Sequence, residues 1–426
     1  MPDSLQAQTQ KMLAELFGNY TGPAFAIRLW DGWRWISRPN ETPAFTVVIE
    51  SPKALATLAA GPNELTLGEA FIHRDIDIEG DIFSVFSVGE YLINRPRTLV
   101  RRTADFLLRM AARSKRWLHH GARHSKARDR FSIQYHYDQP VAFFRPWLGS
   151  TLAYSCAYFR TASDPLDLAQ EQKLEIICRK LRLEPMERFL DIGCGWGSLV
   201  LHAAGNHSAL AHGITLSRIQ ADVALSRIDD ARLGQRCKVE LRDYRDCGHL
   251  AGTFDKIASV GMIEHVGFKN LPEYFRMVYG LLRPGGSLLN HGIVRSPNSP
   301  TREDSFIDRY VFPDGRLVTV SDVINAAESA GLEVRDVENL REHYELTLRS
   351  WVEGLQQNQE TLRNFVPEST YRIWLLYMAG SAAAFRRGDI AIHQILFSRP
   401  ENGRSGMPLV REDWYSTCGQ AEGVEV

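Results

Sequence analysis

The sequence predicts an α/β protein built on a doubly wound parallel sheet, with a smaller N-terminal α+β domain. From about residue 170 to 300, short apolar segments alternate with helical segments, an order typical of a parallel sheet covered by helices on both faces. A turn with three alternating glycines, Gly193, Gly195 and Gly197, follows the first of these strands. The first 90 residues instead carry aromatic and β-branched segments, which favour a separate small sheet.

Length and composition limit the number of domains and the class of protein. At ~100–200 residues per domain, 426 residues suffice for two or three domains. Apolar residues make up 44% and charged residues 24%, which excludes a mostly disordered chain. No stretch reaches the ~18 apolar residues that cross a bilayer, and the polar N-terminus lacks the apolar core of a secretion signal. The six cysteines form no C-x-x-C pair, so we expect free thiols in a reducing cytoplasm.

One segment is strongly basic although the formal net charge is only −1. The segment from Arg95 to Arg130 contains twelve Lys or Arg but only two acids, Asp105 and Asp129. Its net charge is therefore +10, and the rest of the chain carries −11. Such a segment can attract polyanions. Its last part, Gly121–Arg130, has low hydrophobicity and no periodicity. We therefore expect a linker there and predict domains at 1–125 and 126–400, followed by a tail at 401–426.

The N-terminal domain is expected to mix helices and strands. Ser51 is a suitable N-cap for one of the helices, and residues 65–78 alternate polar and apolar side chains. The expected elements are a helix over Ser4–Phe17, strands over Ala24–Ser37 and Ala44–Glu50, a helix from Ser51 to Leu58, a helix over about 82–94 and a helix over Thr98–Leu118.

The larger domain is expected to alternate strands and helices. The predicted strands are Arg188–Ile192, Leu210–Thr215, Lys238–Arg242, Phe254–Val260 and Gly286–Gly292, and the helices between them are Ser198–Ala204, Ser217–Leu233 and Pro272–Leu282. Residues 302–390 are expected to be mostly helical, and Ala391–Ser398 is apolar enough for a final strand. An alternation of this kind places ligands at the carboxyl ends of the parallel strands.

The glycine turn is the sharpest functional signal. Alternating glycines permit positive φ and let a ligand approach the backbone, and the helix that follows favours negative or electron-rich groups at its N-terminus. The spacing is G-x-G-x-G, with Asp191 two residues before the first glycine, so the dinucleotide fingerprint G-x-G-x-x-G fits poorly. The turn resembles the D-x-G-x-G-x-G turn of class I methyltransferases. That resemblance implies a Rossmann-like fold and glycines packed against the methionine part of S-adenosylmethionine; a tight turn without ligand is the alternative.

The next two strand ends supply further cofactor candidates. Thr215 and Ser217 stand where a generic methyltransferase has an acid for the ribose hydroxyls, and Gln220 lies one turn further on. After the third strand, Asp243 is the candidate acceptor for the adenine amino group, and Tyr244 and Arg245 adjoin it. The alternative for Asp243 is an ordinary solvated loop acid.

Several motifs in order resemble the cyclopropane fatty acid synthase family, which includes the mycolic acid cyclopropane synthases. The likeness covers about residues 125 to 400, and the motifs that carry it are Tyr135–Asp138, Tyr154–Phe159, Asp191–Gly197, Gly213–Ser217, Ser259–Gly267, Arg309–Gly315 and Ala384–Arg386. Residues 1–125 resemble, notably at Leu67–Phe71, the N-terminal domain of the longer phospholipid-modifying members. One departure is Gln139–Ala142, where the family usually continues with Gly-Asn near the acyl entrance.

The resemblance implies a reaction on lipid. The sulfonium methyl of S-adenosylmethionine is transferred to a cis double bond of an acyl chain in a membrane phospholipid, a carbocation forms, the new methyl loses a proton, and a cyclopropane ring closes. In the family a bicarbonate ion serves as the base. An alkene is a poor nucleophile, so such a site must align it with the methyl group and exclude water. Dimers are common in the family, so a homodimer is expected.

Carrying the family's site over residue by residue gives two sets. Tyr154 and Ser155 are implied to reach the cofactor carboxylate. The bicarbonate set is Cys156, Glu264, His291, Ile293 and Tyr344. Taken singly, Cys156 and His291 also fit a buried core, and His265 competes with Glu264. A Cys/His/Glu set can suggest zinc, but these residues come from distant segments and the family needs no metal, so no metal is expected; a Cys–His hydrolase would not need the glycine turn.

Three functions are compatible with parts of this residue set. The first is cyclopropane formation on phospholipids, and the second is a related lipid methyltransferase that leaves a methyl or methylene branch. The third is a non-catalytic lipid- or nucleic-acid-binding protein, disfavoured by the complete catalytic set and by the lack of a nucleic-acid motif. A lipid substrate makes the basic segment a candidate for docking on an anionic membrane surface, with a solvated linker as the alternative. We therefore expect a cytoplasmic protein peripheral to the inner face of the membrane.

Overall fold

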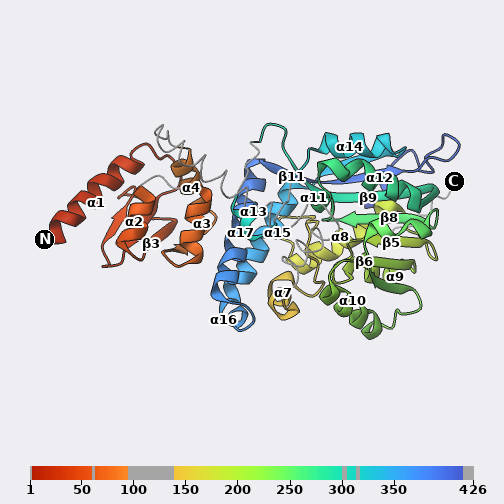
Figure 1. Cartoon of the computed structure of the whole chain (residues 1–426), viewed down its shortest axis with the longest axis horizontal. Coiled ribbons are helices and arrows are strands. Elements are labelled where there is room, and N and C mark those ends of the chain that lie inside the picture. Colours follow the sequence, from red (N-terminus) through yellow and green to blue (C-terminus); the bar gives the residue numbers. More distant parts are fainter. Residues whose placement is uncertain (1, 60–62, 95–138, 300–304, 313–316, 416–426) are drawn as a thin grey trace, which may run out of the picture. The chain divides into compact units, whose positions relative to one another are not determined.

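The computed structural model describes residues 2–59, 63–94, 139–299, 305–312 and 317–415 (Figure 1). Contacts divide the chain into two compact units, the first drawn from Met1–Ala122, Pro300–Pro313 and Trp351–Ala384 and the second from the remaining residues. Several expectations lie outside the described residues. They are the basic segment, the helix over Thr98–Leu118, the boundary after residue 125, the motif Tyr135–Asp138 and the end of the tail.

The second unit contains a seven-stranded sheet with the order β10-β11-β9-β8-β5-β6-β7. The strands are β5 (Arg188–Ile192), β6 (Leu210–Thr215), β7 (Cys237–Leu241), β8 (Phe254–Val260), β9 (Leu282–Arg295), β10 (Glu333–Asn339) and β11 (Ile390–Ser398). Strands β5 to β9 pair in parallel, whereas β11 is antiparallel to both of its neighbours. The predicted doubly wound sheet is confirmed, and the strand order reverses between β5 and β8.

Helices cover both faces of this sheet (Figure 1). One buried cluster joins α8, α9 and α10 to the sheet, and a second joins α12 and α14 to the opposite face. Neighbouring residues alternate between the clusters, Phe189 facing the first and Leu190 the second, as the pleat of a strand requires. The bounds are α8 (Leu166–Leu181), α9 (Ser198–Asn206), α10 (Arg218–Asp230), α12 (Leu271–Leu281) and α14 (Val320–Ser329).

The sheet differs from the sequence prediction at its last added strands. Strand β10 lies in the region expected to be mostly helical. Its residues, EVRDVEN, are all half-buried or exposed, because β10 is an edge strand, so it lacks the apolar run that signals a buried strand. Strand β9 begins at Leu282, earlier than predicted, and runs through the Pro-Gly-Gly segment to Arg295.

The first unit contains a four-stranded sheet with the order β2-β1-β3-β4. Its N-terminal elements are α1 (Pro2–Phe17), β1 (Phe25–Leu29), β2 (Arg34–Ile36), β3 (Phe45–Ile49), α2 (Pro52–Ala59), α3 (Glu64–Ile72), β4 (Ile76–Gly80) and α4 (Val85–Ile93). The segment Ala24–Ser37, predicted as one strand, is the hairpin β1–β2. Gly32 supplies a positive φ of 85° at the turn, and Asp31 accepts a hydrogen bond from the Trp33 amide at 2.9 Å.

The capping prediction for Ser51 is confirmed, since its Oγ accepts a hydrogen bond from the Ala54 amide at 3.2 Å. The alternating segment at residues 65–78 forms helix α3 followed by strand β4. The first unit also includes α13 (Phe306–Tyr310), and a Cβ on Gly68 of α3 would lie 2.4 Å from the Phe306 ring. A glycine is therefore required where α3 and α13 meet.

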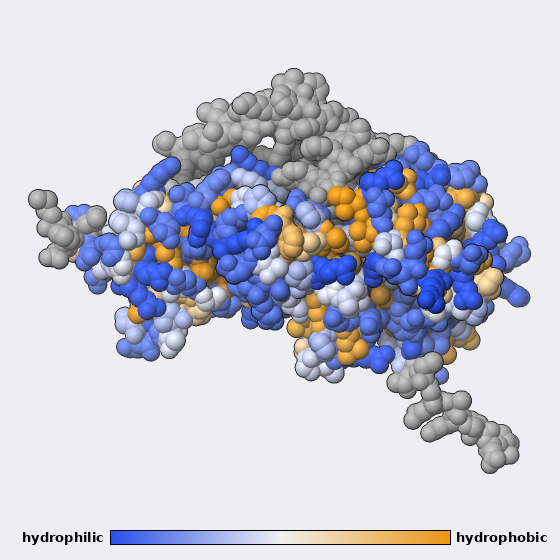
Figure 2. Space-filling model, turned by 90° about the horizontal axis from the view of Figure 1, so that it is seen from below, coloured by the Kyte–Doolittle hydropathy of each residue, from blue (hydrophilic) through white to orange (hydrophobic). Residues whose placement is uncertain are grey.

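The remaining described helices complete the chain. They are α7 (Val141–Leu148), α11 (Ile263–Val266), α15 (Arg341–Gln357), α16 (Gln359–Leu362), α17 (Glu368–Arg387) and α18 (Glu412–Tyr415). On the face shown in Figure 2, hydrophilic residues predominate and hydrophobic residues form separate patches. None of the helices in the described ranges is both long and apolar enough to span a membrane.

Candidate active site

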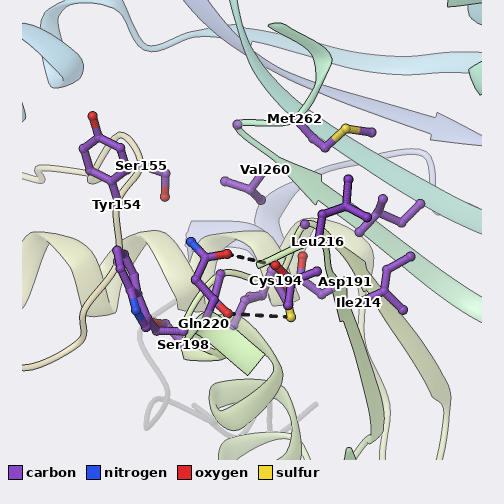
Figure 3. A pocket seen from close by; sticks show the side chains of 18 of the residues that line it. Tyr154, Ser155, Asp191, Cys194, Ser198, Ile214, Leu216, Gln220, Val260 and Met262 are labelled. Carbon is purple, nitrogen blue, oxygen red and sulfur yellow. Dashed lines mark hydrogen bonds between the residues drawn. The ribbon is translucent and has the colours of Figure 1, made fainter. Parts of the chain in front are cut away.

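A cavity of about 150 Å³ opens at the carboxyl ends of β5, β6 and β8, where the strand order reverses and ligands bind in open α/β sheets. Figure 3 shows Tyr154 and Ser155 at one side of it and Met262 at the other, with Asp191 and Cys194 at the glycine turn. Nine of the predicted cofactor residues line the cavity, namely Tyr154, Ser155, Asp191, Gly193, Gly195, Thr215, Gln220, Tyr244 and Arg245.

The three glycines of the turn all have positive φ, at 84°, 54° and 85° for Gly193, Gly195 and Gly197. They differ in what surrounds them. A Cβ on Gly197 would lie 3.0 Å from the Ala224 Cβ, whereas a Cβ on Gly195 would meet no atom of the described residues within 4 Å beyond its own chain neighbours. Gly197 therefore serves packing at the start of α9, and Gly195 leaves its side of the cavity open to a ligand.

Asp191 places a buried carboxylate at the end of β5. Its Oδ1 has no hydrogen-bond partner among the described residues, and burial raises the pKa of the carboxyl to about 7, against the opposing effect of Lys173. Lys173 is itself buried, and burial lowers its pKa to about 8. Its Nζ donates a hydrogen bond to the Ser155 Oγ at 2.9 Å. Asp191 thus offers the cavity an acceptor oxygen, while Lys173 holds the Ser155 hydroxyl.

The end of β6 is organised by hydrogen bonds between its own polar residues. The Thr215 hydroxyl donates to Gln220 Oε1 at 2.8 Å. Ser217 is fully buried and caps α10, its Oγ accepting from the Gln220 amide at 3.3 Å. Thr215 and Gln220 line the cavity, but Ser217 does not. Ser217 therefore positions Gln220 through the helix start.

The end of β7 presents Tyr244 and Arg245 to the cavity. Asp243 is buried there and does not line it. Its carboxylate accepts from the Arg245 guanidinium at 2.7 and 2.9 Å and from the Arg245 backbone at 2.9 Å. The Arg245 guanidinium lies 5.4 Å from the centre of the Tyr244 ring. Asp243 is thus an anchor for Arg245 in this structure, and its predicted contact with adenine stays a prediction.

Glu264 and Ile293, predicted to share a site, are in direct contact. Glu264 lies in α11, just after β8, and its Oε1 accepts a hydrogen bond from the Ile293 amide of β9 at 2.6 Å. Its other oxygen, Oε2, is buried and has no partner among the described residues. Burial raises the pKa of this carboxyl to about 7, although the backbone hydrogen bond from Ile293 acts in the opposite direction.

His291 lies two residues before Ile293 on β9 and is fully buried. Its Nδ1 is 3.3 Å from the Gln394 Nε2, and its Nε2 has no partner in the described part of the chain. Burial holds the pKa of the imidazole well below its usual range, and the nearby lysines Lys173 and Lys180 act in the same direction. The imidazole is therefore neutral at neutral pH.

Cys156 and Tyr344 meet at one backbone carbonyl. The Cys156 Sγ lies 3.2 Å from its acceptor, the Ala157 carbonyl, and 3.9 Å from the Leu340 carbonyl. That Leu340 carbonyl also accepts from the Tyr344 amide at 3.1 Å. Burial raises the pKa of the Cys156 thiol, so it stays protonated as a weak donor. Tyr344 is buried at the start of α15, with its ring 4.8 Å from the Phe385 ring.

Two residues at the site have no counterpart among the sequence predictions. Lys173 lines the cavity, and Gln394 contacts His291. Both lie inside regular elements, α8 and β11, without a glycine turn or motif beside them. The signal available for Lys173 was its place on the apolar side of a helix, where Leu174 and Ile177 are also buried, because a lysine is seldom buried without a partner.

The sheet order, the glycine turn and the cavity at the strand reversal define a class I methyltransferase fold. Residues 124–395 match the family model described as "Mycolic acid cyclopropane synthetase". The chain belongs to this family of S-adenosylmethionine-dependent methyltransferases, and the resemblance seen in the motifs is confirmed. Residues 12–90 match a second model, described as a domain of unknown function (DUF7884).

Two curated relatives show how far the likeness extends. The chain is 40% identical over 394 residues to a "Probable fatty acid methyltransferase" of Pseudomonas putida, covering 91% of this chain and 95% of the relative. It is 38% identical over 269 residues to the "Cyclopropane-fatty-acyl-phospholipid synthase" of Escherichia coli (strain K12), covering 63% of this chain and 68% of the relative.

Among solved structures, the mycolic acid cyclopropane synthase CmaA1 complexed with SAH and CTAB superposes with a TM-score of 0.59 at 30% identity. The cyclopropane synthase MmaA2 of Mycobacterium tuberculosis gives a TM-score of 0.60 at 30% identity. Each match covers 63% of this chain and 97% of the relative.

Proposed function

We propose that this methyltransferase acts on a cis double bond of an acyl chain esterified in a membrane phospholipid and forms a cyclopropane ring. The sulfonium methyl is transferred to one alkene carbon, the new methyl loses a proton, and the ring closes. Family membership supports methyl transfer. The E. coli relative, named as a cyclopropane-fatty-acyl-phospholipid synthase, supports the lipid acceptor.

The cavity suits S-adenosylmethionine. Asp191 Oδ1 is a buried acceptor that no described residue bonds, which fits the cofactor's amino group, and the open space at Gly195 fits its close approach to the backbone. Tyr154 and Ser155 would hold the carboxylate, Thr215 and Gln220 the ribose, and Tyr244 and Arg245 the adenine. Gly193 lines the turn, and three residues would act indirectly: Gly197 through helix packing, Ser217 through Gln220 and Asp243 through Arg245.

The proposal rests on two buried polar atoms, Glu264 Oε2 and His291 Nε2, that have no partner within the described ranges. Glu264 bonds to the amide of Ile293, two residues after His291 on the same strand. A hydrogen carbonate ion has one proton to give and oxygens that accept, so it fits an acceptor and a donor of this kind. When bound, it supplies an oxygen base for the proton lost from the new methyl. Glu264 would accept from it, while His291, Tyr344 and the Cys156 thiol would donate. Ile293 would hold Glu264 in place through its amide.

A dry site is also needed, because water would capture a cation formed from the alkene. Cys156 and His291 are fully buried, and Tyr344 is nearly so. An ionised group is costly in such surroundings unless it is paired. The neutral imidazole and thiol described above fit this need.

A second candidate function is a lipid methyltransferase that leaves a methyl or methylene branch. The observation that favours it is the match over 91% of the chain to the P. putida relative, which is named as a fatty acid methyltransferase. The same residues would bind the cofactor and direct the proton. A 1,2-hydride shift would first move the cation to the carbon that carries the new methyl; loss of a proton from that methyl then gives a methylene branch, and loss of a proton from a neighbouring chain carbon gives a methyl-branched alkene. We keep ring formation as the first proposal because the E. coli relative's name, cyclopropane-fatty-acyl-phospholipid synthase, states both the ring product and the phospholipid acceptor.

The test is a transfer assay with purified protein, methyl-labelled S-adenosylmethionine and liposomes that contain cis-monoenoic phospholipid. Label in the lipid fraction is expected, and its absence would reject the lipid acceptor. Ring and methylene products share the same mass, so mild hydrogenation before mass spectrometry separates them: the ring survives, whereas the methylene takes up hydrogen. Liposomes with saturated chains are the control.

We also propose the domain organisation, the oligomeric state and the location of this protein. Residues 1–125 would form a membrane-associated domain with the basic linker, 126–400 the catalytic domain and 401–426 a tail. A homodimer would place two lipid-binding sites on one membrane, which raises avidity. The protein would then act at the inner face of the cytoplasmic membrane.

A further inference from the structure

A row of polar side chains crosses the sheet at His291. In the strand registers, Glu338 of β10 pairs with Gln394 of β11, and Gln394 pairs with His291 of β9. Register partners point to the same face of a sheet, here the face covered by α8. The row ends at Val260 of β8, which pairs with His291 and lines the cofactor cavity.

Lys180 of α8 fixes the middle of this row. Its side chain is fully buried, and its Nζ donates to Gln394 Oε1 at 2.8 Å and to a carboxylate oxygen of Glu338. Asp336 lies 3.9 Å from the same Nζ. The ammonium is thus neutralised by two carboxylates and bonded to one amide oxygen, so its position is fixed.

The direction of the next hydrogen bond follows from Lys180. An ammonium has three donors and no acceptor, so the Gln394 atom that faces it must be the amide oxygen. The Gln394 Nε2 is then the atom 3.3 Å from His291 Nδ1, and it can only donate. Nδ1 must therefore accept, and a neutral imidazole that accepts at Nδ1 carries its proton on Nε2.

We propose that Lys180 and Gln394 are positioning residues that hold His291 in the Nε2–H tautomer and so keep a donor directed into the base site. The inference rests on the proposed function, in which His291 Nε2 donates to an oxyanion. In the other tautomer Nε2 would present a lone pair to that oxyanion and repel it. Four charged or titratable groups near His291 disfavour the imidazolium form, in which both ring nitrogens carry a proton. They are Lys173, Lys180, His343 and His393.

The direct test is Gln394→Glu, which keeps the size of the side chain. The new carboxylate accepts from Lys180 as before but cannot donate, so it favours the tautomer in which His291 Nδ1 carries the proton and donates a hydrogen bond to this carboxylate. In wild-type protein labelled with ¹⁵N-histidine, the His291 signals, assigned with a His291→Gln variant, are expected to show Nδ1 unprotonated and Nε2 protonated. In Gln394→Glu the Nδ1 signal is expected to become that of a protonated nitrogen.

The turnover rate should depend on which ring nitrogen of His291 carries the proton. We expect kcat of Gln394→Glu at pH 8 to fall at least tenfold, with the Kd for S-adenosylmethionine unchanged within twofold. The added carboxylate also raises the pKa of His291, and an imidazolium donates from both nitrogens. The ratio of variant to wild-type kcat should therefore rise as pH falls. A merely structural defect would lower this ratio equally at every pH.

A second variant guards against misfolding of the first. Lys180→Met with Glu338→Gln removes Lys180 and its nearer carboxylate together, which buried pairs tolerate far better than loss of one partner, and Asp336 keeps its ion pair with Arg411. The Gln394 amide is then free to turn over, and signals of both His291 tautomers are expected. Ser398→Ala, a buried polar change at the far end of β11, is the control that should leave both spectrum and turnover unchanged.

Each result decides the inference. Unchanged His291 signals in Gln394→Glu, or an Nδ1–H imidazole in the wild type, overturn the positioning role. A shifted tautomer with unchanged kcat overturns its importance for the reaction. Failure of the proposed function appears separately, as wild-type protein that transfers no methyl to lipid, and in that case the ¹⁵N spectra still test whether Lys180 and Gln394 set the tautomer.

Discussion

Glu264 combines two properties that a purely structural acid lacks. One carboxylate oxygen is held by the Ile293 amide at 2.6 Å, while the other is buried without a partner among the described residues. A buried acceptor left unsatisfied costs about 1–3 kcal/mol, so a ligand that satisfies it gains that free energy on binding. This is why we assign Glu264 to the base site.

The first prediction concerns Glu264→Gln. Its amide oxygen can still accept from Ile293, but an NH₂ group replaces the free acceptor, so the variant should fold, bind S-adenosylmethionine normally and lose about 10²-fold or more in kcat. Cofactor titration calorimetry and the transfer assay measure the two effects. Glu345→Gln, which removes one acid of an i,i+4 ion pair on α15, is the control. Unchanged turnover in Glu264→Gln would remove the base-site assignment.

The same residue predicts a pH effect on stability. Burial raises the folded-state pKa of Glu264 from 4.5 to about 7, so between these values the folded state holds a proton that the unfolded state has lost. Wild-type protein should therefore lose stability relative to Glu264→Gln as pH rises from about 4.5 to 7, by about 3 kcal/mol in all. Denaturant titrations at pH 4.5, 6 and 7.5 measure the difference. A difference that does not change with pH would contradict it.

Gly195 predicts loss of cofactor binding on substitution. Gly195→Val would fill the open side of the cavity, so its Kd for S-adenosylmethionine should rise more than about 100-fold, or 2.7 kcal/mol. Gly252→Val is a matched control, because Gly252 also has positive φ, at 64°, and open space at its Cβ, but does not line the cavity. If Gly252→Val weakened cofactor binding as much as Gly195→Val, backbone strain, and not the filled cavity, would explain the loss.

Local motifs predicted much of the site and missed a definite part of it. The D-x-G-x-G-x-G turn predicts Asp191 and Gly195 beside a ligand, and both line the cavity, because a turn is set by neighbouring residues; their contact with the cofactor stays a prediction. Ser217 and Asp243 were chosen at the right strand ends, yet their side chains bond to their own helix start or to Arg245. Partners of this kind depend on rotamers and on tertiary contacts, which spacing along the chain does not encode.

At the scale of elements, burial decided which predictions succeeded. Strands β5, β6 and β8 are apolar and were predicted with their observed bounds. The edge strand β10 was missed because none of its residues is fully buried and four of the seven are charged, which leaves no apolar run. Helix α3 was obscured because its sequence alternates polar and apolar residues. Sheet order itself comes from contacts between distant segments, so the alternation of strands and helices predicts a doubly wound sheet but not its strand order.

Arg372 of α17 gives the element-scale prediction. It is buried, stacks 3.9 Å from the Phe71 ring centre, and donates to the Phe71 and Ile76 carbonyls and to Asp77. Arg372→Met leaves these acceptors without a donor, so unfolding free energy should fall by about 2–4 kcal/mol. Thermal unfolding measures it. Arg363→Met removes a more exposed ion pair with Glu368 and should cost about 1 kcal/mol or less; equal losses would contradict the role of Arg372.

At the scale of the whole molecule, contacts group residues 305–312 and 351–384 with the N-terminal region. A domain boundary placed at residue 125 from composition along the chain cannot predict such a grouping, because the grouped segments are far apart in the sequence. The division into 1–125, 126–400 and 401–426 stays a prediction.

The basic segment supplies a whole-molecule prediction that lies outside the described residues. Replacing Arg113, Lys115 and Arg116 by Ala should weaken binding to anionic vesicles by up to ~3 kcal/mol, at ~1 kcal/mol per cation, with cofactor affinity intact. Sedimentation with vesicles measures it. A triple change at the exposed Arg232, Arg236 and Lys238 is the charge-matched control, and equal vesicle binding in the two variants would favour a solvated linker.

The central claim is that this chain converts unsaturated phospholipid acyl chains to cyclopropane chains with Glu264 in the base site. The most direct measurement is mass spectrometry of membrane lipids, before and after mild hydrogenation, from cells that express the wild type or Glu264→Gln. The claim predicts acyl chains one CH₂ heavier that resist hydrogenation, present with the wild type and nearly absent with the variant. Lipids unchanged by wild-type expression, or equal amounts of product from both proteins, would contradict it.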